Sequence, residues 1–376
     1  MTSLHKFGSL FLFLFLASVA WCSSASADVT IRVDYSTDTS NFFNPNTTNG
    51  ALARAAMNAA AAFYSDILED ELSAIAMPFN PAAGQPGKFY GELGGEATWY
   101  FQRKFSHPAT GVTNAVLNST FAEDEYVVFV GARALTGGEL GRGGAGAWAT
   151  SFARNGQFTT DERNQITSMN EDFQTAVARR GQASGFGSWG GSIAFNSNAT
   201  WHFNHNTVPG AGASDFFSVA LHELAHTLGF GGVEQWSDLT SGTTFTGSNA
   251  RTAYGQSSNV PLESADDLAH WLQGISDSNL YGGGEAQKPL MVPNLANGIR
   301  RRLTNLDAAA LVDLGWQIDL PSTSALTAFS LTSASGGNVA GAALSLSIVP
   351  EPTSGLMFVG GLLTLACTSR RRSVHG

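Results

Sequence analysis

The segment His222-Glu223-Leu-Ala-His226 constrains this chain more than any other, because it places three polar side chains in an otherwise apolar stretch. Residues four apart lie on one face of an α-helix, so a helix here would bring both imidazoles within reach of one ion. The surrounding leucines and alanines predict a buried helix, in which unpaired polar groups are costly. Metal binding would account for them, with His222 and His226 as Zn²⁺ ligands and Glu223 as the base that takes a proton from water. The segment therefore predicts a zinc hydrolase, most simply a peptidase.

A catalytic zinc site usually has three protein ligands, and the helix supplies two of them. His270 is the only histidine between this helix and the C-terminal tail, so it is the nitrogen ligand that we expect. A nearby carboxylate is the alternative. The acidic candidates downstream of the helix are Glu234, Asp238, Glu263, Asp266 and Asp267.

The string His-Glu-x-x-His-x-x-Gly, ending at Gly229, resembles the metzincin family of zinc peptidases. The third metzincin histidine follows three residues later, where this chain has Gly232, so the short pattern lacks its last ligand. With His270 and Met291 further on, residues 214–318 instead resemble the leishmanolysin-like branch, in which a long insertion precedes the third histidine. The resemblance implies zinc bound by the three histidines, Glu223 as general base, and Met291 in a tight turn beneath the metal. Leishmanolysin itself is rich in cysteine, which this chain is not.

Both ends of the chain carry sorting features. Residues 1–27 combine an apolar run with a small-residue cleavage site and predict a signal peptide. Residues 321–348 form a linker rich in Ser, Ala and Gly. Residues 349–376 contain Val-Pro-Glu-Pro, an apolar stretch and three arginines, and this order resembles the PEP-CTERM signal. That resemblance implies an exosortase-type enzyme in a Gram-negative bacterium; a simple C-terminal anchor is the alternative.

These signals predict export to the cell surface, the outer envelope or the medium, with transient membrane association. The apolar part of the tail is short for a permanent transmembrane span, which needs roughly 20 residues. A formal net charge of −10 argues against nucleic acid as a partner. The two cysteines, Cys22 and Cys367, lie in the predicted signals, so the predicted catalytic region has neither a disulfide nor a thiolate ligand.

The pattern of residues 28–320 predicts one α+β metallopeptidase domain. The resemblance implies a metzincin-like fold, with a twisted mixed sheet and the zinc helix in residues 28–230. Residues 231–320 would form a smaller, irregular and helical subdomain with the third ligand and the Met-turn. Strands are predicted at 29–35, 126–130, 192–195 and 200–203, and helices at 51–75, from 214 or 215 to 229, and at 304–314.

Two further segments bear on the cleft. The glycine-rich segment Gly141-Arg-Gly143-Gly-Ala-Gly146 opens no clear helix, so a nucleotide loop is a poor reading of it. A glycine-rich loop or a sheet edge that pairs with an extended substrate is the better one. The segment 235–261 is long, polar and rich in Ser, Thr and Gly, which predicts a functional or disordered loop.

Together these features predict an exported zinc endopeptidase that acts on proteins or peptides. A different class of protein also fits the sequence: a cell-surface or extracellular-matrix binding protein that retains a non-catalytic metal site. A zinc hydrolase with a non-peptide substrate is a third reading. The intact Glu223 favours an enzyme, because a purely structural metal site needs no base.

Overall fold

The structure is a computed structural model that describes residues 29–80, 84–182, 184–255, 258–320 and 346–348. The predicted signal peptide, most of the linker and the PEP-CTERM-like segment lie outside the described residues. No helix within the described ranges is both long and apolar enough to cross a bilayer.

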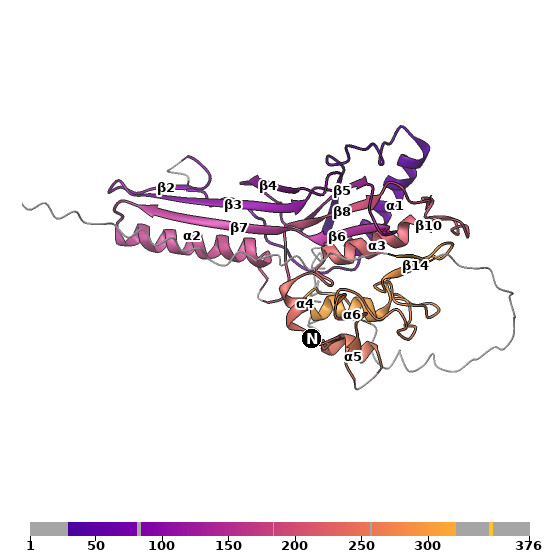
Figure 1. Cartoon of the computed structure of the whole chain (residues 1–376). Coiled ribbons are helices and arrows are strands. Elements are labelled where there is room, and N and C mark those ends of the chain that lie inside the picture. The colour runs from indigo at the N-terminus through magenta and orange to yellow at the C-terminus, as the bar shows by residue number, and fades with distance from the viewer. Residues whose placement is uncertain (1–28, 81–83, 183, 256–257, 321–345, 349–376) are drawn as a thin grey trace, which may run out of the picture.

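A four-stranded sheet forms the centre of the fold, in the order β1-β5-β8-β6 (Figure 1). β1 (Thr30–Asp34), β5 (Glu125–Arg133) and β8 (Gly190–Asn196) are parallel, and β6 (Gly141–Ala145) runs antiparallel at the edge. All of β8 and most of β5 are buried, as is typical of central strands that are covered on both faces. The strands predicted at 29–35, 126–130 and 192–195 are therefore confirmed, and so is an edge position for the glycine-rich segment.

Two helices pack against one another beside this sheet. α1 (Thr48–Ser65) contacts β1 and α3, and α3 (Phe216–Thr227) lies against β6 and β8. The helix predicted at 51–75 is too long, because α1 ends at Ser65. Beyond it, the backbone N–H of Leu72 donates to the Asp124 carboxylate at 2.7 Å, and Ile75 pairs with Phe121 as an isolated bridge. Bonds to distant parts of the chain thus replace the helical ones, although the apolar spacing continues.

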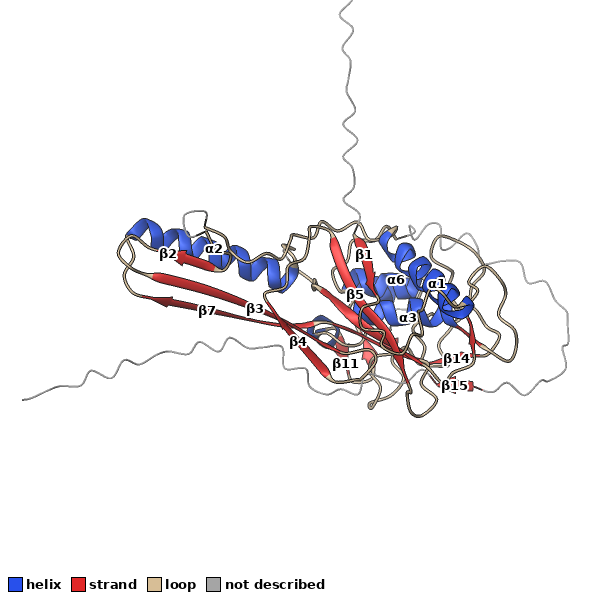
Figure 2. Ribbon diagram, turned by 90° about the horizontal axis from the view of Figure 1, so that it is seen from above, coloured by secondary structure: helices blue, strands red, loops and turns tan. Residues whose placement is uncertain are grey.

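An arm extends away from the central sheet (Figure 2) and was not predicted. Its sheet contains β2 (Lys88–Tyr90), β3 (Glu96–Ser106), β4 (Thr113–Leu117) and β7 (Ala147–Asn155), and α2 (Thr160–Arg179) covers one face. Alternate residues of β3, including Trp99 and Phe101, join Ile166, Phe173 and Val177 of α2 in a separate apolar cluster. The cluster also includes Val127 and Phe129 of β5, so the arm shares this second core with the central sheet.

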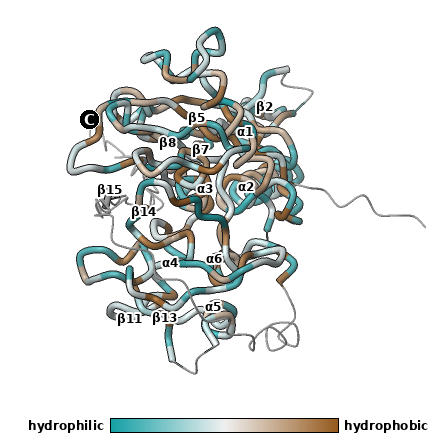
Figure 3. Tube along the Cα trace, turned by 90° about the vertical axis from the view of Figure 1, so that its right-hand side faces the viewer, coloured by the Kyte–Doolittle hydropathy of each residue, from teal (hydrophilic) through white to brown (hydrophobic). Residues whose placement is uncertain are grey.

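The chain after α3 packs on the side of that helix opposite the central sheet (Figure 3). It forms α4 (Glu234–Asp238), β11 (Thr240–Ser241), β12 (Thr244–Phe245), α5 (Ser248–Ala253), β13 (Val260–Pro261), β14 (Asn294–Ala296) and α6 (Asn305–Asp313). β14 pairs with β15 (Leu346–Ile348). The last helix confirms the one predicted at 304–314.

The described part of the insertion at 235–261 is ordered, so the alternative of a disordered loop is wrong, and a functional role stays a prediction. It contains two short helices and a three-stranded sheet. The segment is polar in composition, but two of its aromatic residues hold it to the core. Trp236 stacks on Phe245 with ring centroids 4.4 Å apart, and both contact Trp271.

The described residues form a mixed α+β fold with twisted sheets, which is the fold class that the sequence predicted. The larger hydrophobic cluster joins residues from Val29, directly before β1, to Ile318 after α6, and α3 lies within it.

Candidate metal centre

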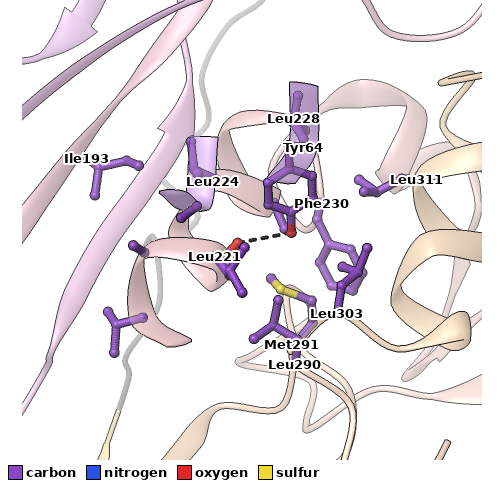
Figure 4. Packing of buried hydrophobic residues seen from close by; sticks show 14 of the residues in the cluster. Tyr64, Ile193, Leu221, Leu224, Leu228, Phe230, Leu290, Met291, Leu303 and Leu311 are labelled. Atoms are coloured by element: carbon purple, nitrogen blue, oxygen red, sulfur yellow. Dashed lines mark hydrogen bonds between the residues drawn. The ribbon is translucent and has the colours of Figure 1, made fainter. Parts of the chain in front are cut away.

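α3 is fixed at both ends. At its start the Asp215 side chain caps the helix by accepting from the Ser218 N–H at 3.1 Å, and Arg300 pairs with Asp215 at 2.7 and 2.9 Å. At its end Trp316 donates to the Leu228 carbonyl at 2.7 Å. Midway, the Tyr64 hydroxyl donates to the Leu221 carbonyl at 3.0 Å (Figure 4). These bonds fix the helix that carries His222, Glu223 and His226, and its cap at Asp215 agrees with the predicted start at 214 or 215.

Three imidazoles meet at one point. The Nε2 atoms of His222 and His270 are 3.0 Å apart, those of His226 and His222 are 3.1 Å apart, and those of His226 and His270 are 3.2 Å apart. All three side chains are buried. They form the one group of His, Cys, Asp and Glu side chains, among the described residues, that could hold a metal ion. His270 thus lies where a third ligand was predicted, and the acidic alternatives do not join the group.

The other ring nitrogens explain the orientation of the three rings. His222 Nδ1 lies 2.9 Å from the Leu290 carbonyl, and His226 Nδ1 lies 2.8 Å from the Phe230 carbonyl. His270 Nδ1 lies 3.2 Å from both oxygens of Asp267. A carbonyl or carboxylate oxygen only accepts, so each Nδ1 carries the proton and each Nε2 presents its lone pair. Three facing lone pairs repel one another unless a cation lies between them, so this donor set suits a metal ion.

Burial also keeps two of these imidazoles, those of His222 and His226, uncharged. Desolvation, followed by the neighbouring imidazoles, lowers the pKa of His222 well below its usual range. The same two causes lower the pKa of His226 to about 3. Both rings are therefore neutral at pH 7, which is the form that binds metal.

His270 reaches the helix because the chain turns back tightly after α3. Gly229 and Gly231 adopt φ values of +102° and +80°, which favour glycine. A Cβ on Gly231 would lie 2.5 Å from the Cβ of Ala269, so the turn packs directly against the segment that carries His270. The Trp236 indole N–H donates to the Leu268 carbonyl at 2.9 Å and fixes the same segment from α4.

Met291 is fully buried next to the residue that bonds His222. Figure 4 shows Leu221 and Leu224 of α3 between Ile193 of the central sheet and Met291. Leu290, whose carbonyl accepts from His222, directly precedes Met291 in this turn. Met291 therefore lies in a turn that contacts the metal-site helix, and its place beneath a metal ion stays a prediction.

A single carboxylate, that of Asp307 in α6, holds this turn. Asp307 accepts from the backbone N–H groups of Leu290 at 2.8 Å and Met291 at 3.2 Å, and from the Trp271 indole at 3.0 Å. Burial raises the pKa of Asp307, and these hydrogen bonds oppose that rise. We did not predict this role. The Thr304-x-x-Asp307 capping box is visible in the sequence, but it accounts for only part of what the carboxylate binds.

Glu223 packs directly against the edge strand. The Gly143 N–H donates to Glu223 Oε2 at 2.5 Å. A Cβ on Gly141 would lie 2.6 Å from Glu223 Oε1, and one on Gly143 would lie 2.4 Å from the Glu223 carbonyl oxygen. The glycines of β6 thus make room for α3 and its glutamate, which explains their presence without a nucleotide.

A small pocket lies beside His222. Its lining is mainly apolar and comes from α3, from the turn of Met291 and from the chain that follows it. The lining residues are Ser218, Val219, His222, Leu290, Val292, Leu295 and Arg301. Its free volume is about 10 Å³, which is room for about one water molecule and too little for a side chain.

The histidines at 107, 202 and 205 lie outside the group. His202 Nε2 bonds the Asn204 carbonyl at 2.9 Å, the His205 ring stacks on Phe217, and His107 Nδ1 accepts from the Ala109 N–H. All three therefore have local structural contacts.

Searches against models of protein families, against curated proteins and against solved structures found no match. The functional argument therefore depends on the residues of the site.

Proposed function

We propose that this chain is an exported zinc-dependent endopeptidase. The observation that carries the proposal is the convergence of three Nε2 lone pairs directly beside Glu223. Tetrahedral zinc with bonds of roughly 2.0–2.1 Å separates its nitrogen ligands by roughly 3.3–3.4 Å, slightly more than the separations here. A small outward movement of the rings would therefore fit the ion. Three protein ligands leave a coordination position open, which is typical of catalytic and not of structural zinc.

The side chain that moves protons in this proposal is Glu223. Bound zinc would polarise the scissile carbonyl and acidify a water molecule. Glu223 takes the proton of the attacking water and delivers it to the leaving amine. The Gly143 N–H orients the carboxylate for both transfers. The histidines, held through their Nδ1 atoms, keep the ligand atoms in place during the reaction.

A polypeptide substrate is supported by the surroundings of the site. β6 is hydrogen-bonded to β8 along one side and is the edge of the central sheet, immediately beside Glu223. An extended peptide can add to such an edge through main-chain hydrogen bonds.

The wider assignment is a metzincin-like peptidase with the distant third histidine of the leishmanolysin-like branch. Its support is the helix motif, His270 and the buried turn of Met291. The N-terminal apolar run and the PEP-CTERM-like tail support export and surface sorting in a Gram-negative bacterium.

Two variants and a control test the proposal. Glu223→Gln should bind one equivalent of zinc yet lose casein hydrolysis, because the ligands remain and the base is removed. His270→Ala should lose zinc as well as activity, whereas His107→Ala should keep both. Full activity of Glu223→Gln would refute the role of Glu223. A wild-type protein that holds zinc but cleaves neither casein nor gelatin would instead favour the surface-binding reading.

A further inference from the structure

The outer strand of the arm, β7, has one unpaired edge. β7 pairs with β3 over nine residues, and β3 pairs with β2 and β4 on its other side. Within the described ranges no strand lies on the far side of β7. Figure 2 shows β7 at the margin of the arm, and its Thr150 hydroxyl donates to Gln174 Oε1 of α2 at 3.0 Å. Its last five residues, Ser151 to Asn155, are all exposed.

The pairing of β3 identifies which backbone groups of β7 face outward. Trp99 donates to the Gly87 carbonyl, and Phe101 exchanges bonds with Asn118, so the odd residues of β3 face β2 and β4. The N–H and C=O of a strand residue point to the same edge, and successive residues alternate. The even residues of β3 therefore bond the odd residues of β7. The outward groups are those of Trp148, Thr150, Phe152 and Arg154.

This edge lacks the features that usually prevent strands from pairing. Exposed edges are commonly protected by Pro, Lys or inward-pointing charges. β7 has the sequence AWATSFARN, in which Arg154 is the one charged residue and proline is absent. At roughly 3.3 Å per residue it presents about 30 Å of backbone. Such an edge is suited to pairing with another strand.

The sequence of β7 is complementary to itself. If two copies run antiparallel about Ser151, Trp148 lies opposite Arg154 of the other copy and Thr150 lies opposite Phe152. These outward-facing pairs exchange main-chain hydrogen bonds and place a guanidinium beside an indole. On the other face, small residues meet small ones, with Ser151 opposite its own copy. No like charges lie opposite each other in this register.

We propose that β7 pairs with β7 of a second copy of this chain, so that the arm sheets of two molecules form one continuous antiparallel sheet. The contact is symmetric, as in most homodimers, because the same nine residues lie on both sides. It lies on the arm and does not depend on the proposed peptidase activity.

A cysteine reporter at the symmetry axis tests this register. In the mature chain with Cys22 and Cys367 replaced by serine, Ser151→Cys should form a disulfide-linked dimer on mild oxidation. The two Cβ atoms would lie roughly 5 Å apart, within disulfide reach. Ala149→Cys is the matched control on the same face, since its copy would be roughly 13 Å away along the strand. Equal cross-linking of both variants would indicate random collision and overturn the register.

Sedimentation of the uncross-linked protein tests the dimer itself. We expect a dimer at tens of micromolar and a monomer for Phe152→Pro, which removes an outward N–H and leaves the β3 bonds intact. Circular dichroism should show that this variant is folded. A wild-type monomer at 100 micromolar would overturn the proposal. If Phe152→Pro then raised the KM for casein and not for short peptides, the edge would instead bind substrate.

Discussion

Replacing Asp307 with asparagine should weaken both the fold and the metal site. One oxygen of Asp307 accepts from the Leu290 N–H at 2.8 Å and from the N–H and hydroxyl of Thr304 at 2.9 and 2.7 Å. The other oxygen accepts from Trp271 and Met291. Asparagine has one acceptor oxygen, so its amide nitrogen must face two or three buried donors. No rotation of the side chain satisfies both sets.

The size of the effect follows from these bonds. Hydrogen bonds to a charged acceptor contribute about 1.5–3 kcal/mol each, so losing three would cost roughly 5–9 kcal/mol. Part of this is offset, because burial raises the pKa of Asp307 and its charge is itself costly in the folded state. We expect a net loss of about 3–5 kcal/mol, or a fall in Tm of roughly 10 °C. Since the adjacent Leu290 carbonyl orients His222, zinc affinity should fall about 10- to 100-fold.

Thermal unfolding with and without a chelator, and zinc titration against a chromophoric competitor, measure these two effects. Asp277→Asn is the control, because Asp277 is about half exposed and pairs with Lys288 on the surface. It should change Tm by no more than a degree or two. The reasoning about Asp307 fails if Asp307→Asn behaves like Asp277→Asn in both measurements.

Three further changes have defined outcomes. Gly141→Ala should lower kcat for a peptide more than tenfold with zinc content unchanged, because its Cβ would displace the Glu223 carboxylate; Gly144→Ala, whose Cβ meets nothing within 4 Å, should leave kcat unaltered. Burial raises the pKa of Asp70 to about 6, so its stabilising contribution is complete below about pH 4 and is lost as the pH rises through 6. In urea, the free energy of unfolding of Asp70→Asn should therefore exceed that of wild type by up to about 2 kcal/mol above pH 7, after solvent screening, and should equal it at pH 4. Equal free energies of unfolding at pH 8 would contradict this. Because burial lowers the pKa of both His222 and His226, the latter to about 3, zinc affinity should fall no more than about tenfold from pH 7.5 to 5.5, whereas three ordinary imidazoles would lose about a thousandfold.

Much of the candidate site could be predicted from local sequence. The spacing of His222 and His226 and the Asp215 cap are local features, and the structure has both as expected. His270 followed from elimination, since the chain offers no other histidine in that region. Asp307 could not be found in this way, because its partners come from segments 3 to 36 residues away. Its role exists only once the tertiary structure brings them together.

The arm shows a different limit. The alternation of Ala97, Trp99 and Phe101 in β3 is a strand pattern that could have been recognised. Its register with β7, however, depends on a sheet that forms across more than forty residues. The predicted end of α1 was wrong for the opposite reason. Apolar residues continue at helical spacing past Ser65, but Leu68 and Leu72 are buried by contacts with distant parts of the chain and do not belong to a helix. Periodicity indicates which residues are buried, and it does not indicate what buries them.

The separation of the ligands along the chain gives the site a second consequence. His226 and His270 are 44 residues apart. An ion bound by both would cross-link the chain and close a loop of that length, in a domain that contains no cysteine to do so by a disulfide. Constraining a loop of this length with a disulfide is worth about 4 kcal/mol in the chain-entropy description. A coordinated ion can act as a comparable cross-link that reductants do not open and chelators do. An exported protein built in this way would keep its shape in reducing surroundings and lose it where free metal is scarce.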